Sequence, residues 1–267
     1  MNEHDAAPPL LAQRFDEAIA HGYSWIFGDL NVLAELVSQL LLGQHRHVRK
    51  ILEGVTTANP NSSEMMIEST QKKLAPTTEK GKEHRDGWLF QLIAWIGVRI
   101  VDRGRLLISP PHDRPADKGF DALIIELEAG SHQPVSMMIC EEKATDNPRN
   151  KFQQQVLSEF KACKAGERDT EIMSELTTML EASHINDNEV DRFLELVMWQ
   201  RDRAYRVCLT TTGIDPDEQS RARLFKDFDD VIPGAATLRR AEMFQVDDLR
   251  VWMDVFAAKV AQKLAEL

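Results

Sequence analysis

Two stretches of the chain are almost continuously apolar. The first covers residues 119–127 and the second covers residues 135–143. Short apolar runs that are bounded by turn residues are typical of buried β-strands. The segment between them, residues 128–134, contains glycine, serine and proline, which favour a turn. The pattern therefore predicts a β-hairpin.

The charged residues of this hairpin are expected at its open end. Asp121 lies near the start of the first run, and Glu141, Glu142 and Lys143 end the second. Because alternate residues of a strand point to the same face, Glu141 and Lys143 share a face and Glu142 points to the other. Antiparallel pairing sets the start of the first strand beside the end of the second. We therefore expect Asp121 to lie next to Glu141.

Two carboxylates that lie this close repel each other, and a shared proton or a divalent cation relieves the repulsion. Mg²⁺ or Mn²⁺ takes oxygen ligands, so the expected metal ligands are Asp121, Glu141 and the backbone carbonyl of Glu142. Lys143 would orient or deprotonate the attacking water, or stabilise negative charge in the transition state. This chemistry is phosphodiester hydrolysis, with Asp121, Glu141 and Lys143 as the expected catalytic residues.

Further elements are expected on both sides of the hairpin. Apolar periodicity predicts a helix over residues 87–96, a helix over 151–164 and a strand over 204–210 that extends the sheet beside the hairpin. The other expected helical segments are residues 10–21, 30–42, 63–74, 169–203 and 246–267. Residues 220–240 are expected to form a charged surface loop, with a phosphate-contacting patch as the alternative.

The chain length and its 43% hydrophobic content suit one or two domains with a sizeable core. We expect a helical N-terminal region over residues 1–55 and a polar linker over 56–82. A nuclease-like domain is expected over residues 83–267, where the last helix covers the core. The fold class that these elements favour is α/β.

The arrangement of Asp121 and Glu141-x-Lys143 on a strand-turn-strand unit between helices resembles the PD-(D/E)XK nuclease superfamily, over about residues 84–165. The resemblance implies a restriction-endonuclease-like mixed central sheet flanked by helices, and a Mg²⁺-dependent endonuclease activity. Gly119-Phe120 stands where the family has its proline. The preceding helix carries Gln91 where many members have an acid.

The Gln91 position leaves three alternatives open: Glu83 compensates, a single-metal site suffices, or activity is lost. In the family's order, a loop and a helix follow the motif, and Gln154 on that helix is in a region where many members carry a glutamine. Gln91 and Gln154 are therefore possible accessory residues. Arg149 and Lys151 are the expected nucleic-acid-binding residues.

The net charge of −11 argues against a chain that grips DNA by itself, because nucleic-acid affinity comes largely from basic residues. Either positive residues cluster locally, as Arg99, Arg103 and Arg105 do, or a partner supplies the contacts. The chain is similar to nuclease subunits of bacterial anti-phage defence systems of the Hachiman type. That similarity implies DNA as the substrate and a helicase or other ATPase as the partner.

Cys140, Cys163 and Cys208 have neither metal-ligand spacing nor a paired framework, which favours a reducing cytoplasm. No apolar run approaches the length of a membrane span and no signal peptide is recognised, so no membrane role is expected. Two other functions compete with the nuclease. The chain could be a catalytically inactive nuclease-fold subunit for assembly or nucleic-acid sensing, or an adaptor in which Glu141 and Lys143 form only a surface ion pair.

Overall fold

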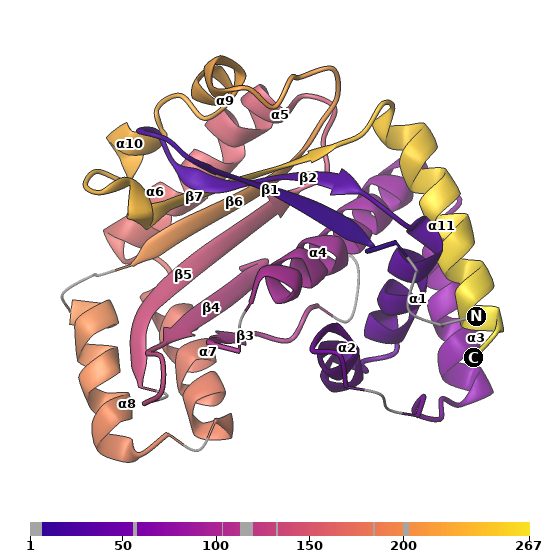
Figure 1. Ribbon diagram of the computed structural model, residues 1–267, viewed down its shortest axis with the longest axis horizontal. Helices are drawn as coiled ribbons and strands as arrows, with labels where there is room; N and C mark the ends of the chain where they lie inside the picture. The colour runs from indigo at the N-terminus through magenta and orange to yellow at the C-terminus, as the bar shows by residue number, and fades with distance from the viewer. Residues whose placement is uncertain are drawn as a thin grey trace.

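The structure is a computed structural model, and it describes residues 7–55, 58–102, 104–112, 120–131, 133–183, 185–199 and 203–267. In these residues a seven-stranded mixed sheet forms the centre of the molecule (Figure 1). Its strands are β1 (Leu10–Asp16), β2 (His21–Phe27), β3 (Leu106–Ile108), β4 (Ala122–Leu127), β5 (Pro134–Lys143), β6 (Ala204–Thr211) and β7 (Arg239–Gln245).

The strand order across the sheet is β1-β2-β7-β6-β5-β4-β3. The four central strands β2, β7, β6 and β5 run parallel. The outer strands β1, β4 and β3 pair antiparallel with their neighbours. The hairpin β4–β5 therefore joins the parallel centre through β5, and its open end lies at the carboxyl ends of the parallel strands.

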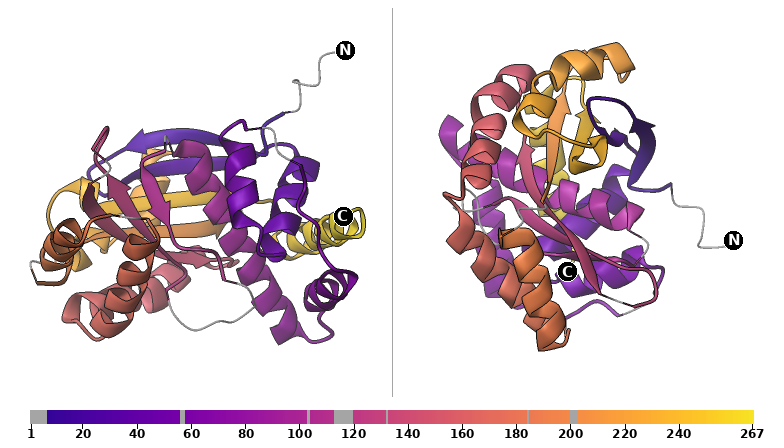
Figure 2. Two further views of the ribbon diagram at one scale, coloured as in Figure 1. Left: turned by 90° about the horizontal axis from the view of Figure 1, so that it is seen from below. Right: turned by 90° about the vertical axis from the view of Figure 1, so that its left-hand side faces the viewer.

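Helices cover both faces of the sheet (Figure 2). One face carries α1 (Leu30–Leu41), α2 (His45–Leu52), α3 (Glu64–Leu74), α4 (Glu79–Val101) and α11 (Leu249–Ala265). The other face carries α5 (Pro148–Lys151), α6 (Leu157–Ala165), α7 (Asp169–Ala182), α8 (Asp187–Leu194), α9 (Glu218–Leu224) and α10 (Phe228–Val231). Shorter turns of π-helix span Phe152–Val156 and Glu195–Trp199, and a 3₁₀ turn spans Ala236–Leu238.

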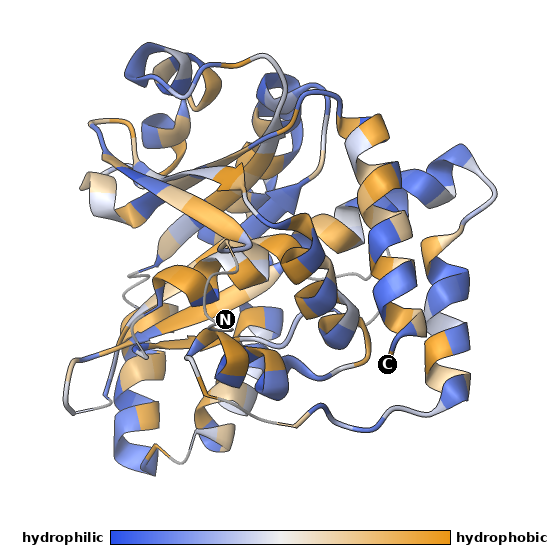
Figure 3. Ribbon diagram, turned by 45° about the vertical axis from the view of Figure 1, so that its right-hand side comes forward, coloured by the Kyte–Doolittle hydropathy of each residue, from blue (hydrophilic) through white to orange (hydrophobic). Residues whose placement is uncertain are grey.

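Each face of the sheet has its own apolar core, because successive residues of a strand point to opposite sides. On β5, Met137 and Ile139 belong to the core beneath α6 and α7, whereas Cys140 belongs to the core beneath α4. Figure 3 shows orange residues along the central strands and alternating orange and blue residues along the outer helices. All three cysteines are buried: Cys140 and Cys208 in the α4 core and Cys163 in the other.

Several sequence predictions are confirmed. The mixed α/β class with a central sheet flanked by helices is correct, as are the hairpin and the strand beside it, β6. The helices expected over residues 30–42, 63–74, 87–96, 151–164 and 246–267 are present, and α7 and α8 occupy the helical stretch 169–203. Gly119 and Arg103 lie outside the described residues.

Two expectations are wrong. Residues 10–21 are not a helix but β1, a turn and the first residue of β2, so the N-terminal region is not entirely helical. The pairing of β2 with β7, more than 200 residues away, overrides local helical preference. Residues 220–240 are not a charged surface loop, because they contain most of α9, all of α10 and the buried start of β7.

Within the described part of the chain, the helices are either too short or too polar to cross a bilayer.

Candidate active site

The hairpin brings the predicted acids and lysine together. β4 pairs with β5 in the register Ala122↔Cys140, so Asp121, directly before β4, lies beside Glu141. Asp121 Oδ2 and Glu141 Oε2 are each 2.6 Å from Lys143 Nζ. Lys143 therefore bridges the two carboxylates on one face of the sheet, as the alternation of β5 predicts.

This cluster is largely enclosed. The side chains of Lys143, Asp121 and Glu141 are 23%, 10% and 5% exposed. Burial raises the pKa of Glu141 to about 7, and the nearby Asp121 carboxylate adds to the rise. Burial lowers the pKa of Lys143, but the two carboxylates outweigh that effect and the pKa is raised. Lys143 is thus held as an ammonium ion, a form that stabilises negative charge rather than removing a proton.

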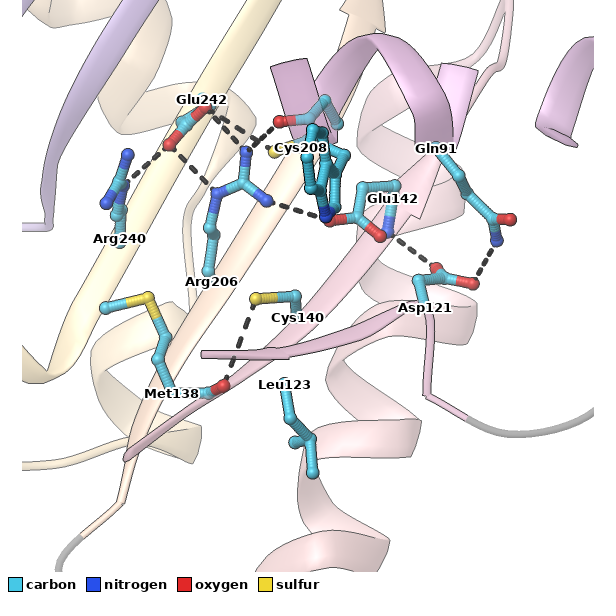
Figure 4. Close-up of polar contacts among 12 residues, drawn as sticks. Gln91, Asp121, Leu123, Met138, Cys140, Glu142, Arg206, Cys208, Arg240 and Glu242 are labelled. Carbon is cyan, nitrogen blue, oxygen red and sulfur yellow. Dashed lines mark hydrogen bonds and ion pairs between the residues drawn. The ribbon is translucent and has the colours of Figure 1, made fainter. Parts of the chain in front are cut away.

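Asp121 is fixed from three sides. Its Oδ2 accepts the Lys143 ammonium and, at 2.7 Å, the backbone N–H of Glu142. Its Oδ1 accepts a hydrogen bond from Gln91 Nε2 on α4 (Figure 4). The predicted accessory residue Gln91 therefore does reach the site, and it acts as a donor that holds the Asp121 carboxylate in place.

Glu142 points to the other face of the sheet and its side chain enters a buried ion network (Figure 4). Arg206 on β6 donates through Nη1 to Glu142 Oε1 at 2.8 Å, and through Nε and Nη2 to Glu242 on β7 at 2.9 Å each. Arg240 Nε donates to Glu242 Oε1 at 2.6 Å, and Trp25 Nε1 donates to Glu242 Oε2 at 2.8 Å. The network thus connects β5, β6 and β7, and through Trp25 also β2. It lies on the opposite face of the sheet from the Asp121 cluster.

The pKa values of the two acids in the network are shifted in opposite directions. Burial alone would raise the pKa of Glu242, but Arg206 and Arg240 outweigh burial and lower it to about 2. Burial also acts on Glu142, where it exceeds the attraction of Arg206, and the pKa is raised. Glu142 Oε2 is buried without a hydrogen-bond partner. Within the network, the Glu142 carboxylate therefore accepts fewer hydrogen bonds than the Glu242 carboxylate.

The residues that could hold a divalent cation such as Mg²⁺ are Asp121 and Glu141. Two carboxylate oxygens converge on one cationic atom, Lys143 Nζ, which marks a point where positive charge is favoured. A cavity of about 10 Å³, just enough for one water molecule, lies on the other side of Asp121, beside Gln91, Glu142 and Arg206. No group of three or more His, Cys, Asp or Glu side chains arranged to hold a metal occurs in the described ranges.

Other predicted residues lie away from the cluster. Glu83 is exposed on α4, two turns before Gln91 and about 12 Å from it along the helix axis, so it does not stand in for an acid there. Gln154 is exposed on the π-helical turn, and among the described contacts none joins it to Asp121 or Lys143. Neither residue therefore complements the candidate metal ligands.

The two residues expected to contact nucleic acid, Arg149 and Lys151, differ in how far they are engaged within the protein. Arg149 is engaged within the protein, since its Nη2 pairs with Asp227 at 2.6 Å and its Nη1 donates to the carbonyls of Leu224 and Lys226. Lys151 is half-buried at the end of α5. In the arginine group near residue 100, Arg99 pairs with Asp102 at 3.2 Å. Lys151 is therefore the better candidate for contacting phosphate.

Sequence reasoning missed the residues that support the site from behind. Arg206 and Glu242 are fully buried charges on adjacent strands. The available signal was a lone arginine inside the apolar run of β6, because a charge in a buried strand requires a partner. The partner was hidden, since the charged residues of β7 made that strand resemble a surface loop.

The chain matches no family model, and no curated protein matches it.

Proposed function

We propose that this protein is a metal-dependent nuclease of the PD-(D/E)XK type, with a restriction-endonuclease-like fold. The observation that carries the proposal is the Asp121–Lys143–Glu141 cluster, in which one ammonium lies 2.6 Å from each of two buried carboxylates. One acid directly before a strand and an acid-x-lysine on the partner strand, all meeting at one point, suit the hydrolysis of a phosphodiester bond.

Asp121 and Glu141 would hold the Mg²⁺ ion, with the Glu142 backbone at its side. When bound, the ion supplies a Lewis acid for the phosphate and lowers the pKa of a coordinated water. Gln91 and the Glu142 N–H keep the Asp121 carboxylate in one orientation. Lys143 remains an ammonium and stabilises the negative charge that grows on the phosphate oxygens.

We further propose that the substrate is DNA and that a partner controls the nuclease in anti-phage defence. The acidity of the chain supports dependence on a partner, since a net charge of −11 repels a polyanion. The internal engagement of Arg149 supports it too, because that guanidinium is already paired with Asp227. A helicase or other ATPase subunit would supply most of the contacts to the DNA.

Cleavage assays with the purified protein test the proposal. Linear and supercoiled DNA are incubated with Mg²⁺ or Mn²⁺, with and without extract from the host cell. Cleavage should require the metal, and Lys143→Met should lower the rate by at least about 100-fold. Lys82→Met is the matched control, because Lys82 forms an exposed ion pair with Glu79 on α4, and it should cleave like the wild type.

Calorimetric titration with Mg²⁺ separates binding from chemistry. Glu141→Gln should abolish metal binding because it removes a ligand. Lys143→Met should retain metal binding or tighten it, since the ammonium competes with the ion for the same two oxygens. An active Glu141→Gln variant would overturn the proposed site.

The second candidate is a catalytically inactive nuclease-fold subunit. Gln91 favours it, because an amide occupies the position near Asp121 where another acid would complete the metal site. The Lys143 bridge also favours it, because the ion pairs already neutralise much of the carboxylate charge. Absence of both cleavage and Mg²⁺ binding in the wild type would select this alternative.

A further inference from the structure

A groove of about 990 Å³ lies away from the candidate site. It shares the sheet face with Glu142 but lies toward the opposite end of the central strands, over Met138, Ala204 and Arg240. The groove exists because α4 ends at Val101 and leaves this part of the sheet face uncovered, while the β1–β2 hairpin forms a wall. Its volume is at the upper end of the range for small-molecule sites.

Arg240 gives the groove an unsatisfied donor. This residue is 9% exposed and its Nε donates to Glu242 at 2.6 Å. Its Nη2 is buried and lacks a hydrogen-bond partner, although the guanidinium lies over the ring of Tyr23 at 5.2 Å. An unpaired buried donor costs free energy, which an acceptor brought into the groove would recover after a small shift of the side chain.

A second arginine stands on the wall next to it. Arg14 on β1 is 70% exposed and forms an ion pair at 3.8 Å with Asp16 on the same strand. Such an exposed pair contributes little and leaves the guanidinium available to a ligand. The hairpin side of the groove thus presents the guanidinium group of Arg14 and the carboxylate of Asp16, with Arg240 beside them on β7.

The acids of the opposite wall also form ion pairs, a buried one at Asp102 and an exposed one at Glu126. Asp102 pairs with Arg99 at 3.2 Å and accepts the backbone N–H of Arg105. Glu126 pairs with Arg105 at 3.6 Å and accepts the Ser136 hydroxyl at 3.3 Å. The rest of the lining is largely apolar, with Ile100, Leu106, Ile124, Met138 and Leu238. Among the described lining residues, Arg240 is the one with a buried polar side-chain atom that lacks a hydrogen-bond partner.

We propose that this groove binds a small organic anion. A carboxylate or phosphate group would be received by Arg240 and Arg14, and an apolar body would lie on Met138 and Tyr23. Charge-assisted hydrogen bonds to arginine are among the strongest available to such a ligand. No residue of the Asp121 cluster lines the groove, and Arg240 connects to that cluster only through the Glu242–Arg206–Glu142 network.

Fluorescence titration with 8-anilinonaphthalene-1-sulfonate tests the groove, because this probe is an organic anion with an aromatic body. We expect one site per chain. Competition by octanoate would identify a carboxylate ligand, and competition by adenosine monophosphate a phosphate ligand. Failure of both to compete would overturn the proposal.

Substitutions in the groove show whether the fluorescent probe binds there. Ala12 lines the groove on β1, so Ala12→Trp should block binding, whereas Leu11→Trp changes the neighbouring exposed residue on the opposite face and should not. Arg14→Ala should weaken binding about tenfold, and Arg46→Ala, an exposed arginine elsewhere, should not.

Arg240→Lys keeps a cation beside Glu242 but removes Nη2, and should also weaken the probe about tenfold. If that variant unfolds, the Ala12 and Arg14 variants still test whether the probe binds in the groove. Equal binding by all variants, or none by the wild type, would overturn the proposal.

Discussion

Lys143 lies between two carboxylates that together carry more negative charge than it can neutralise. When Asp121 and Glu141 are both ionised, the cluster has two anions and one cation, and its side chains are largely removed from water. Uncompensated charge is costly in such a place. The raised pKa of Glu141 expresses this cost. A proton or a divalent cation can supply the missing positive charge.

This imbalance predicts a dependence of stability on pH. The pKa of Glu141 is about 7 in the folded protein, against an ordinary value of 4.5. Between these values the folded protein binds more protons than the unfolded chain, so the free energy of unfolding should fall as the pH rises from 4.5 to 7. The loss from this group is up to about 3 kcal/mol. Urea titrations across this range without metal measure it.

Glu141→Gln is the control for the pH prediction, because it removes the titrating group and retains its size. The variant should show a flatter decline over the same range. Saturating Mg²⁺ should also reduce the decline in the wild type, since the ion holds Glu141 ionised. Identical slopes for wild type and variant in the absence of metal would contradict the prediction.

At the scale of the elements, the N-terminal hairpin is attached to the parallel strands at a very close contact. Gly22 on β2 pairs with Ala241 on β7 and has a φ of +157°. A Cβ added to Gly22 would meet the Ala241 carbonyl oxygen at 1.8 Å. Only glycine allows the two backbones to approach this closely, so this residue fixes the pairing of β2 with β7.

Gly22→Ala should therefore destabilise the protein by more than about 2 kcal/mol, since the clash is with backbone and cannot be relieved by a side-chain rotation. The midpoint of chemical unfolding measures the loss. Gly43→Ala is the comparison: Gly43 also has a positive φ, of +75°, but nothing lies within 4 Å of an added Cβ. It should cost only the backbone strain. An equal effect of the two substitutions would refute the role of close approach.

The Arg206 network predicts a second large effect. Arg206→Met leaves Glu142 and Glu242 buried with one fewer cation, and breaking a buried pair in this way costs about 3–5 kcal/mol. Lys263→Met removes an exposed ion pair with Glu266 and should leave the unfolding midpoint almost unchanged. An Arg206 variant as stable as the wild type would show that the network contributes no net stability.

Local patterns explain which elements were predictable from the sequence. The hairpin β4–β5 pairs residues close in the chain, and its apolar runs and turn indicate it directly. The Asp121, Glu141 and Lys143 contacts follow from alternation along β5. By contrast, β2 pairs with β7, and β7 carries the buried Glu242, whose partners Arg206 and Trp25 are distant in sequence. Charge that is buried in pairs cannot be distinguished from surface charge by a pattern along one strand.

At the scale of the whole molecule, charge sets the limits on nucleic-acid binding. The net charge of −11 opposes long-range attraction of a polyanion. Of the two expected phosphate contacts, Arg149 is already paired with Asp227. The isolated chain therefore has an unfavourable net charge for DNA binding, and one of its two expected phosphate contacts is already paired within the protein.

We expect the purified chain to bind DNA with a dissociation constant weaker than about 10 µM at physiological salt. Fluorescence anisotropy with labelled duplex and single-stranded DNA measures this constant. Lys151→Ala should weaken the residual binding, and a partner fraction from host extract should strengthen it. Submicromolar binding by the chain alone, unchanged in Lys151→Ala, would contradict both the weak binding and the assigned contact.

The buried thiols have a consequence for how unfolding of this molecule can be followed. Cys140 and Cys208 lie in the core beneath α4, and Cys163 lies in the core on the other side of the sheet. Burial raises the pKa of all three, that of Cys163 to about 12, so the reactive thiolate is scarce in the native state. An alkylating reagent will therefore modify each cysteine only when its own layer opens. The chain thus carries natural reporters on both sides of its sheet, and the order of their modification will show which layer separates first.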